Sequence, residues 1–162
     1  MKVLIPVDSS AAALAPVKLV QSRRDIEVLL LNVQPLLYRH ISQFTSREAR
    51  EDARAERSAA AMARAIEALS AAGVRFRALA EAGAPAERIA AVAEREAVDE
   101  ILFGVGRHPA WLRLLNPSIA QAVSARTDIP VTVLARGRAG AFERYAVPAG
   151  VAGLAALLLA VE

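Results

Sequence analysis

The sequence predicts an α/β fold, in which a parallel sheet is covered by helices on both faces. Short aliphatic stretches of strand length alternate along the chain with segments of helical periodicity. Most of these stretches are apolar throughout, as in strands that are buried on both faces. With 162 residues, 55% hydrophobic and only 4% aromatic, the chain has room for one domain with an aliphatic core.

The first part of the chain predicts a strand, a helix and a second strand. Residues 3–7 form an apolar run that ends in Asp8 and two serines, which is typical of a buried strand followed by a helix amino terminus. Pro16 cannot lie deep inside a helix, so we expect the first helix over residues 14–23. Residues 26–33 are almost entirely aliphatic, as expected of a central strand.

A long amphipathic helix is predicted after the polar and aromatic connection of residues 34–44. Thr45 and Glu48 have the spacing of a capping box, in which each side chain satisfies one free amide of the helix end. Gly73 ends the helix. One apolar stripe recurs at intervals of three and four residues and is expected to face the core: Ala55, Ala59, Met62, Ile66 and Leu69.

The second half of the chain predicts three more strands and two more helices. Residues 74–79 alternate apolar residues with arginine, which indicates a strand near the edge of the sheet. A helix opens at Pro85 and packs through Ile89, Val92 and Ala93. The strand of residues 101–103 runs into a glycine break at Gly104, and a loop and a helix lead to a last strand, Val131 to Leu134.

The predicted sheet places one candidate binding site. In open parallel sheets, ligands bind beyond the carboxyl ends of the strands, at the point where the strand order reverses. We therefore expect the site at the ends of three strands, Pro6 to Asp8, Val33, and Phe103 to Gly106. Backbone amides of the last loop would face a helix amino terminus, which is a favourable position for phosphate.

These elements, in this order, resemble the universal stress protein family over residues 1 to about 136. The resemblance is carried by the motifs LIPVDSS, LLLNVQP, ILFG and IPVTVLAR. It implies a Rossmann-like fold of the adenine nucleotide alpha hydrolase-like type, with a five-stranded parallel sheet in the order 3-2-1-4-5. It also implies a role in the stress response and a homodimer that forms through the last strand, Val131 to Leu134.

The resemblance extends to a nucleotide motif that is only partly kept. ATP-binding members carry a glycine, two residues, a glycine, nine residues, and then glycine followed by serine or threonine. Gly104 matches the first glycine, but Arg107 and Pro117 stand at the second and third, before Ser118. Arg107 adds a bulky side chain, although its guanidinium offers an alternative phosphate contact, and Pro117 has no amide. The altered motif thus predicts weakened phosphate binding.

The resemblance places Asp8 at the ribose end of the pocket and Val33 where adenine lies. The candidate nucleotide-binding residues are Pro6, Val7, Asp8, Val33, Phe103, Gly104, Gly106, Arg107, Ser118 and Ile119. Because of the altered glycines, we expect a non-catalytic binding or regulatory module with weakened or lost ATP binding and no resident cofactor. The alternative is an ATP or AMP switch, or a slow ATPase that uses Mg²⁺.

Other chemistry finds little support in the sequence. The chain has no cysteine, and its two histidines, His40 and His108, have no other donors at metal-ligand spacing, so neither a metal site nor a catalytic constellation is predicted. The basic residues alternate with acidic ones at a net charge of +3, which argues against a nucleic-acid partner. The amino terminus lacks the features of a secretion signal, which favours a cytoplasmic location.

Two apolar segments remain outside the nucleotide prediction. The loop Trp111 to Leu115 either packs on the domain or contacts a protein partner. Beyond the domain of residues 1–136, residues 137–162 form a basic linker and an apolar tail. As a helix, residues 146–161 would span about 24 Å, short of the ~30 Å bilayer core. The tail therefore has three open roles: contact with a membrane, docking on its own or a neighbouring subunit, or binding of a partner.

Overall fold

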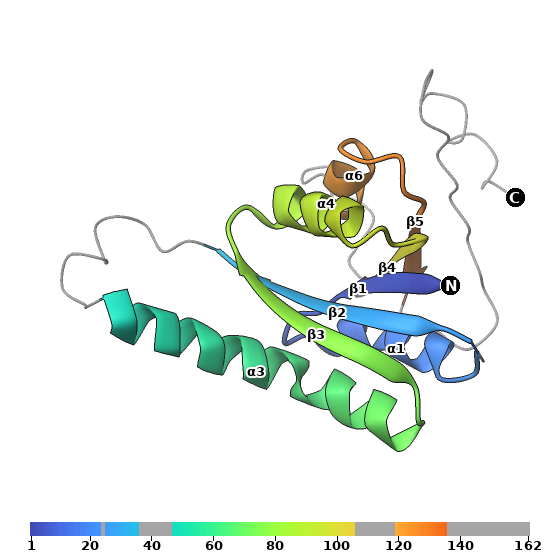
Figure 1. Cartoon of the computed structure of the whole chain (residues 1–162), viewed down its shortest axis with the longest axis horizontal. Helices are drawn as coiled ribbons and strands as arrows, with labels where there is room; N and C mark the ends of the chain where they lie inside the picture. Colours follow the sequence, from blue (N-terminus) through green and yellow to red (C-terminus); the bar gives the residue numbers. More distant parts are fainter. Residues whose placement is uncertain (24, 36–46, 106–118, 136–162) are drawn as a thin grey trace, which may run out of the picture.

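Five parallel strands form a single sheet in the order β3-β2-β1-β4-β5 (Figure 1). The structure is a computed structural model that describes residues 1–23, 25–35, 47–105 and 119–135. The strand bounds are β1 (Lys2–Pro6), β2 (Glu27–Gln34), β3 (Arg75–Ala82), β4 (Glu100–Val105) and β5 (Val131–Ala135). The predicted fold class and strand order are confirmed.

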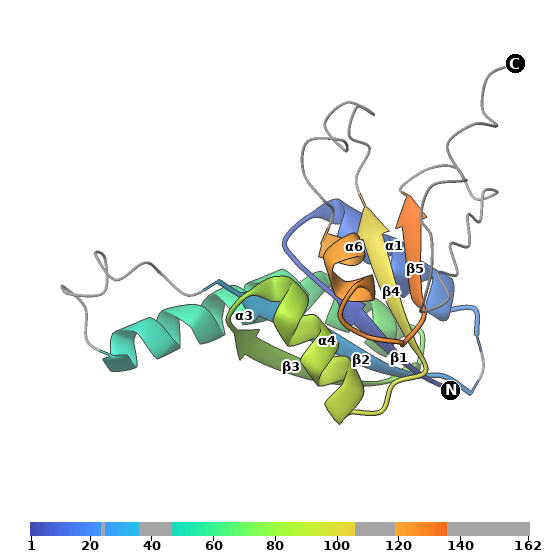
Figure 2. The ribbon, with the colours of Figure 1, turned by 90° about the horizontal axis from the view of Figure 1, so that it is seen from above.

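Helices cover both faces of the sheet, as predicted (Figure 2). They are α1 (Leu14–Val20), α3 (Arg47–Ala71), α4 (Pro85–Arg95) and α6 (Ile119–Ser124), with a short 3₁₀ turn, η1 (Ala11–Ala13), before α1. Successive residues of a strand point to opposite faces, so each strand feeds two cores. The α1 and α3 side buries Val3, Ile5, Val28, Leu30 and Leu102. The α4 and α6 side buries Leu4, Leu29, Leu31, Ile101 and Phe103.

The first helix begins where the sequence predicts but ends earlier. It starts at Leu14, and the buried Pro16 lies in its first turn, where the missing amide costs no helical hydrogen bond. It ends at Val20, because the amide of Arg23 donates to the Val20 carbonyl at 3.0 Å in a tight turn. Asp25 then adopts a left-handed φ of 62° and directs the chain into β2.

The predicted core face of the long helix is only partly correct. Met62 and Leu69 are buried and Ile66 is partly buried, but Ala55 and Ala59 are exposed. The buried positions are instead Ser58, Met62, Ala65 and Leu69. Ser58 can be buried because its hydroxyl donates a hydrogen bond to a buried acceptor, the side-chain oxygen of Asn32. Exposure of an alanine costs little, since its methyl group contributes little apolar surface to the core. Thr45, the first half of the predicted capping box, lies outside the described residues.

The remaining predicted elements agree with the structure. Gly73 ends α3 with a left-handed φ of 66°, and the strand predicted at residues 74–79 is β3, at one edge of the sheet. On α4, the predicted packing residues Ile89, Val92 and Ala93 are all buried.

The loop of residues 106–118 and the tail of residues 136–162 lie outside the described ranges. Within those ranges, no helix is both long and apolar enough to cross a membrane.

A charged cluster joins three elements at the amino-terminal edge of the sheet. Glu96, at the end of α4, accepts hydrogen bonds from Lys2 Nζ of β1 at 3.3 Å and from Arg77 Nη2 of β3. Lys2 Nζ also donates to the Glu96 carbonyl at 2.9 Å. Burial by itself raises the pKa of Glu96, but the hydrogen bonds and charges of Lys2 and Arg77 outweigh it and lower the pKa below its ordinary value of 4.5.

Replacement of Glu96 by glutamine tests this cluster through the pH dependence of stability. A lowered pKa in the folded state stabilises the protein above the unfolded pKa, and this contribution is lost as the pH falls through the folded pKa. We expect the melting temperature of the wild type to exceed that of Glu96→Gln at neutral pH and the gap to close below about pH 4. Glu94→Gln, an exposed change on the same helix, is the control. A gap that stays constant with pH would rule out an electrostatic contribution.

Candidate functional site

The carboxyl ends of β1, β2 and β4, which are predicted to form the site, lie at the same end of the sheet. β1 is the central strand, and β2 and β4 are its two neighbours. β1 pairs with β2 on one side, with Pro6 opposite Leu31, and with β4 on the other, with Leu4 opposite Ile101. Chain order therefore reverses between β1 and β4, which is the position where open parallel sheets bind ligands (Figure 2). The structure brings the ends of β1, β2 and β4 together, as the sequence predicts.

Asp8 begins a tight turn at the end of β1. Its carboxylate oxygen Oδ1 accepts a hydrogen bond from the Ser10 amide at 2.9 Å, and the side chain is exposed. This side-chain turn leads directly into η1 and α1. Because the turn engages one carboxylate oxygen, the orientation of the side chain is set before a ligand arrives, and the other oxygen can accept a hydrogen bond from a sugar hydroxyl.

A buried polar cluster that the sequence patterns do not predict lies next to Asp8 and Val33. The side chain of Asn32 donates to the Val7 carbonyl at 2.7 Å and accepts from the Ser58 hydroxyl at 2.9 Å. Val33 itself is half-buried at the end of β2. The available signal was the asparagine itself, a polar residue inside an aliphatic run, since polar side chains in such strands need buried partners.

Gly104 is required by packing. A Cβ atom added to it would lie 2.0 Å from the Ala12 carbonyl oxygen and 2.9 Å from Pro16 Cδ. The glycine thus lets η1 and α1 approach β4 closely. Its φ is not left-handed, unlike those of Gly73 and Gly83. The first glycine of the nucleotide motif therefore has a structural role that is independent of any ligand.

The other predicted site residues divide into two groups. Pro6 ends β1 and the buried Val7 follows it, the Phe103 side chain packs in the core beneath α4 and α6, and Ile119 begins α6 with 50% of its surface exposed. The second group, Gly106, Arg107 and Ser118, lies outside the described residues. In the part of the chain that the structure describes, no group of three or more His, Cys, Asp or Glu side chains could hold a metal ion.

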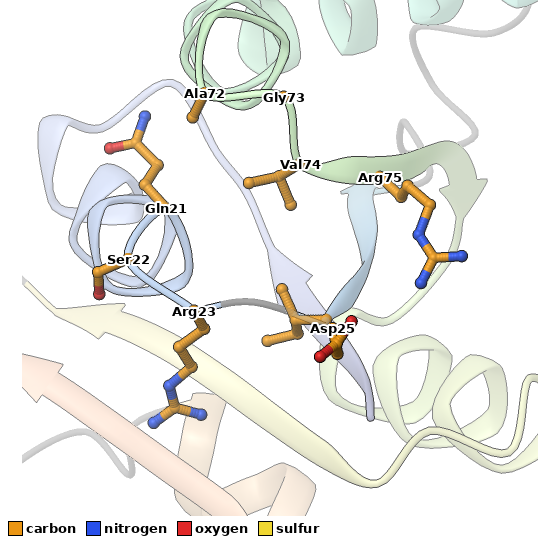
Figure 3. A pocket seen from close by; sticks show the side chains of 9 residues that line it. Gln21, Ser22, Arg23, Asp25, Ala72, Gly73, Val74 and Arg75 are labelled. Atoms are coloured by element: carbon orange, nitrogen blue, oxygen red, sulfur yellow. The ribbon is translucent and has the colours of Figure 1, made fainter.

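A pocket of about 520 Å³ lies at the opposite, amino-terminal edge of the sheet, between the ends of α1 and α3 (Figure 3). Its charged lining does not converge: the guanidinium groups of Arg23 and Arg75 lie on opposite sides, and Arg23 points away from the centre. Gln21 is occupied by a hydrogen bond to the Ala68 carbonyl at 2.7 Å. The pocket therefore lacks the convergent polar groups of a binding site.

Known structures share the fold of this chain over most of its length. The hypothetical protein MJ0577 is 25% identical, with a TM-score of 0.66, and the match covers 85% of this chain and 96% of that one. A universal stress family protein from Arabidopsis thaliana with AMP bound is 18% identical, with a TM-score of 0.61 and coverage of 85% and 93%. A universal stress protein in complex with cAMP is 18% identical, with a TM-score of 0.63 and coverage of 83% and 96%.

A search of curated proteins gave no match to this chain. A family model, by contrast, matches residues 1–135, a range that includes every residue that the structure describes, and its description is Universal stress protein family. The match spans all five strands and both helical layers, including the ends of β1, β2 and β4. The chain therefore belongs to the universal stress protein family.

Proposed function

We propose that this protein is a non-catalytic regulatory module that binds an adenine nucleotide through its base and ribose, and that it holds AMP at least as well as ATP. The observation that carries the proposal is the contrast within one site. The Asp8 end is well ordered by hydrogen bonds, whereas the phosphate motif has arginine and proline at two glycine positions. A site of this kind gains little from additional phosphates.

Two relatives support the choice of ligand class. The structures with AMP and with cAMP are of proteins that share this fold, and both ligands carry one phosphate on an adenosine. The carboxylate oxygen of Asp8 that is not bonded to the Ser10 amide can accept a hydrogen bond from a ribose hydroxyl. In the family resemblance, Val33 lies where the adenine binds, and β2 brings it to the same edge of the sheet as Asp8.

Calorimetry with AMP, and with ATP and Mg²⁺, tests the proposal on the purified full chain. We expect AMP to bind and ATP to bind no more tightly. ATP binding with Mg²⁺ that is submicromolar and tighter than AMP binding would favour the alternative, a switch or slow ATPase. Absence of binding by either nucleotide would contradict the proposal.

Substitution of Asp8 by alanine is expected to lower AMP affinity about tenfold or more, because it removes a charge-assisted hydrogen bond to the ribose. Asp8→Asn keeps an oxygen for the Ser10 amide but loses the negative charge, so we expect an intermediate affinity. Asp128→Ala, at an exposed aspartate before β5, is the matched control and should leave the affinity unchanged. Equal affinities of the Asp8→Ala variant and the wild type would place the ribose elsewhere.

The predicted homodimer stays a prediction. β5 is an edge strand of the sheet, which a dimer through Val131 to Leu134 requires. The contacts proposed for Trp111 to Leu115 and for residues 146–161 fall outside the described residues.

A further inference from the structure

Asn32 is a buried polar residue with three hydrogen bonds. Its side chain is 2% exposed, and its Nδ2 donates to the Val7 carbonyl at 2.7 Å. Its Oδ1 accepts from Ser58 Oγ of α3 at 2.9 Å and from Gln34 Nε2 at 2.7 Å. Ser58 is 3% exposed, so the pair is enclosed by the core. An amide side chain with three of its four bonding positions filled is held in one orientation.

The bond from Asn32 reaches the peptide group that connects Val7 to Asp8. The Val7 amide donates to the Leu31 carbonyl at 2.8 Å, and the Val7 carbonyl accepts from Asn32, so β2 holds both polar groups of Val7. The carbonyl of Val7 and the amide of Asp8 share one plane. A hydrogen bond that fixes this carbonyl therefore fixes the direction in which Asp8 leaves the sheet.

Strand stability does not explain an asparagine at this position. The preceding residues of β2 are leucines, and a further aliphatic residue has a higher strand propensity than asparagine. An asparagine also needs buried partners, which here are the carbonyl of Val7, just after β1, and the hydroxyl of Ser58 in α3. An apolar residue at position 32 would leave both of these groups unpaired. What the asparagine adds is control over the orientation of the Val7 carbonyl.

We propose that Asn32 is a positioning residue of the nucleotide site. It holds the peptide plane between Val7 and Asp8, and through it the carboxylate of Asp8, in the orientation that receives the ligand. Ser58 supports Asn32 from α3. This inference rests on the proposed nucleotide-binding function and deepens it.

The substitution Asn32→Asp is the sharpest test, because it keeps the acceptor for Ser58 and replaces the donor to Val7 by an oxygen. At about pH 8 an ionised carboxylate would face the Val7 carbonyl, and we expect AMP affinity about tenfold below that of the wild type. Burial raises the pKa of such a carboxyl, so acidification to about pH 5.5 protonates it and restores a hydrogen-bond donor to the Val7 carbonyl. The difference in AMP affinity between the variant and the wild type should then become smaller. The wild type in the same pH series corrects for ionisation of the AMP phosphate.

Two further variants separate positioning from folding. Ser58→Ala removes the hydrogen bond to Asn32 Oδ1 but leaves the hydrogen bond from Asn32 Nδ2 to the Val7 carbonyl. We therefore expect the variant to be less stable than the wild type, with an AMP affinity within about twofold of it. The double variant Asn32→Leu with Ser58→Ala makes the pair apolar and keeps the fold even if Asn32→Asp does not, yet it removes the donor to Val7. We expect it to lose AMP affinity about tenfold.

Amide hydrogen exchange of Ser10 in the ligand-free protein distinguishes this inference from the proposed function. Exchange should be several-fold faster in Asn32→Asp and in the double variant than in Ser58→Ala, because the turn at Asp8 loosens. If the wild type binds no AMP but this exchange pattern holds, the nucleotide proposal fails and the positioning of Asp8 stands. Wild-type affinity and exchange in both the folded Asn32→Asp and double variants would overturn the inference.

Discussion

Gly104→Ala is expected to destabilise the protein by about 3 kcal/mol or more, a large fraction of the net stability of an ordinary domain. The added methyl group would lie 2.0 Å from the Ala12 oxygen and 2.8 Å from its carbonyl carbon. These are backbone atoms, so no side-chain rotation can relieve the overlap, and η1 must move away from β4. Urea denaturation followed by circular dichroism measures the loss.

A second glycine provides the matched control. A Cβ atom at Gly73 would meet no atom within 4 Å, although its φ of 66° is left-handed. Gly73→Ala should therefore cost only about 1 kcal/mol, from the backbone conformation alone. If Gly104→Ala were no more destabilising than Gly73→Ala, close packing of η1 on β4 could not be the reason for the glycine.

The expected loss at Gly104 changes what the nucleotide motif says about function. A glycine that packing requires is retained whether or not phosphate binds nearby. The sequence shows a glycine at the end of β4, but it cannot show which contact demands it, because Ala12 and Pro16 lie about ninety residues earlier in the chain. The presence of Gly104 is therefore weak support for a phosphate site, and the other motif positions carry more information.

Local patterns predicted the fold well, because each depends on neighbouring residues. The aliphatic run of residues 26–33 demands cover on both faces, and such a strand belongs at the centre of a parallel sheet, where β2 and β1 lie. The alternation of apolar residues with arginine at residues 74–79 indicates a strand with one exposed face, and it predicted the edge strand β3. Periodicity, charge alternation and glycine position are all readable without knowledge of distant contacts.

Long-range polar contacts were beyond such patterns. Asn32 meets Val7 and Ser58, which are 25 and 26 residues away, and Lys2 meets Glu96 at a separation of 94. The predicted stripe on the long helix failed for this reason at Ala55 and Ala59. Apolar periodicity ranked alanine above serine, whereas the buried acceptor on Asn32 gave Ser58 the core position. The part of the site that sequence missed is the part that holds Asp8 in place.

Restoring both glycines of the motif is expected to strengthen ATP binding about tenfold or more. In the double variant Arg107→Gly with Pro117→Gly, the first change removes a bulky side chain and the second adds a backbone amide that proline lacks. Amides in such a loop donate to phosphate oxygens, and ATP has more of these than AMP. Calorimetry with Mg²⁺ should therefore show a gain for ATP that exceeds the gain for AMP.

The single variants decide what each altered position does at present. If the Arg107 guanidinium replaces the lost amide contacts, Arg107→Gly alone lowers nucleotide affinity, whereas Pro117→Gly alone raises it. Ala110→Gly adds a glycine to the same loop outside the motif, and it should change neither affinity. A double variant that binds ATP no better than the wild type would mean that the phosphate end is limited by something other than these two residues. Since Asp8 and Asn32 are unchanged in every one of these variants, a gain confined to ATP locates the weakness at the phosphate end of the site.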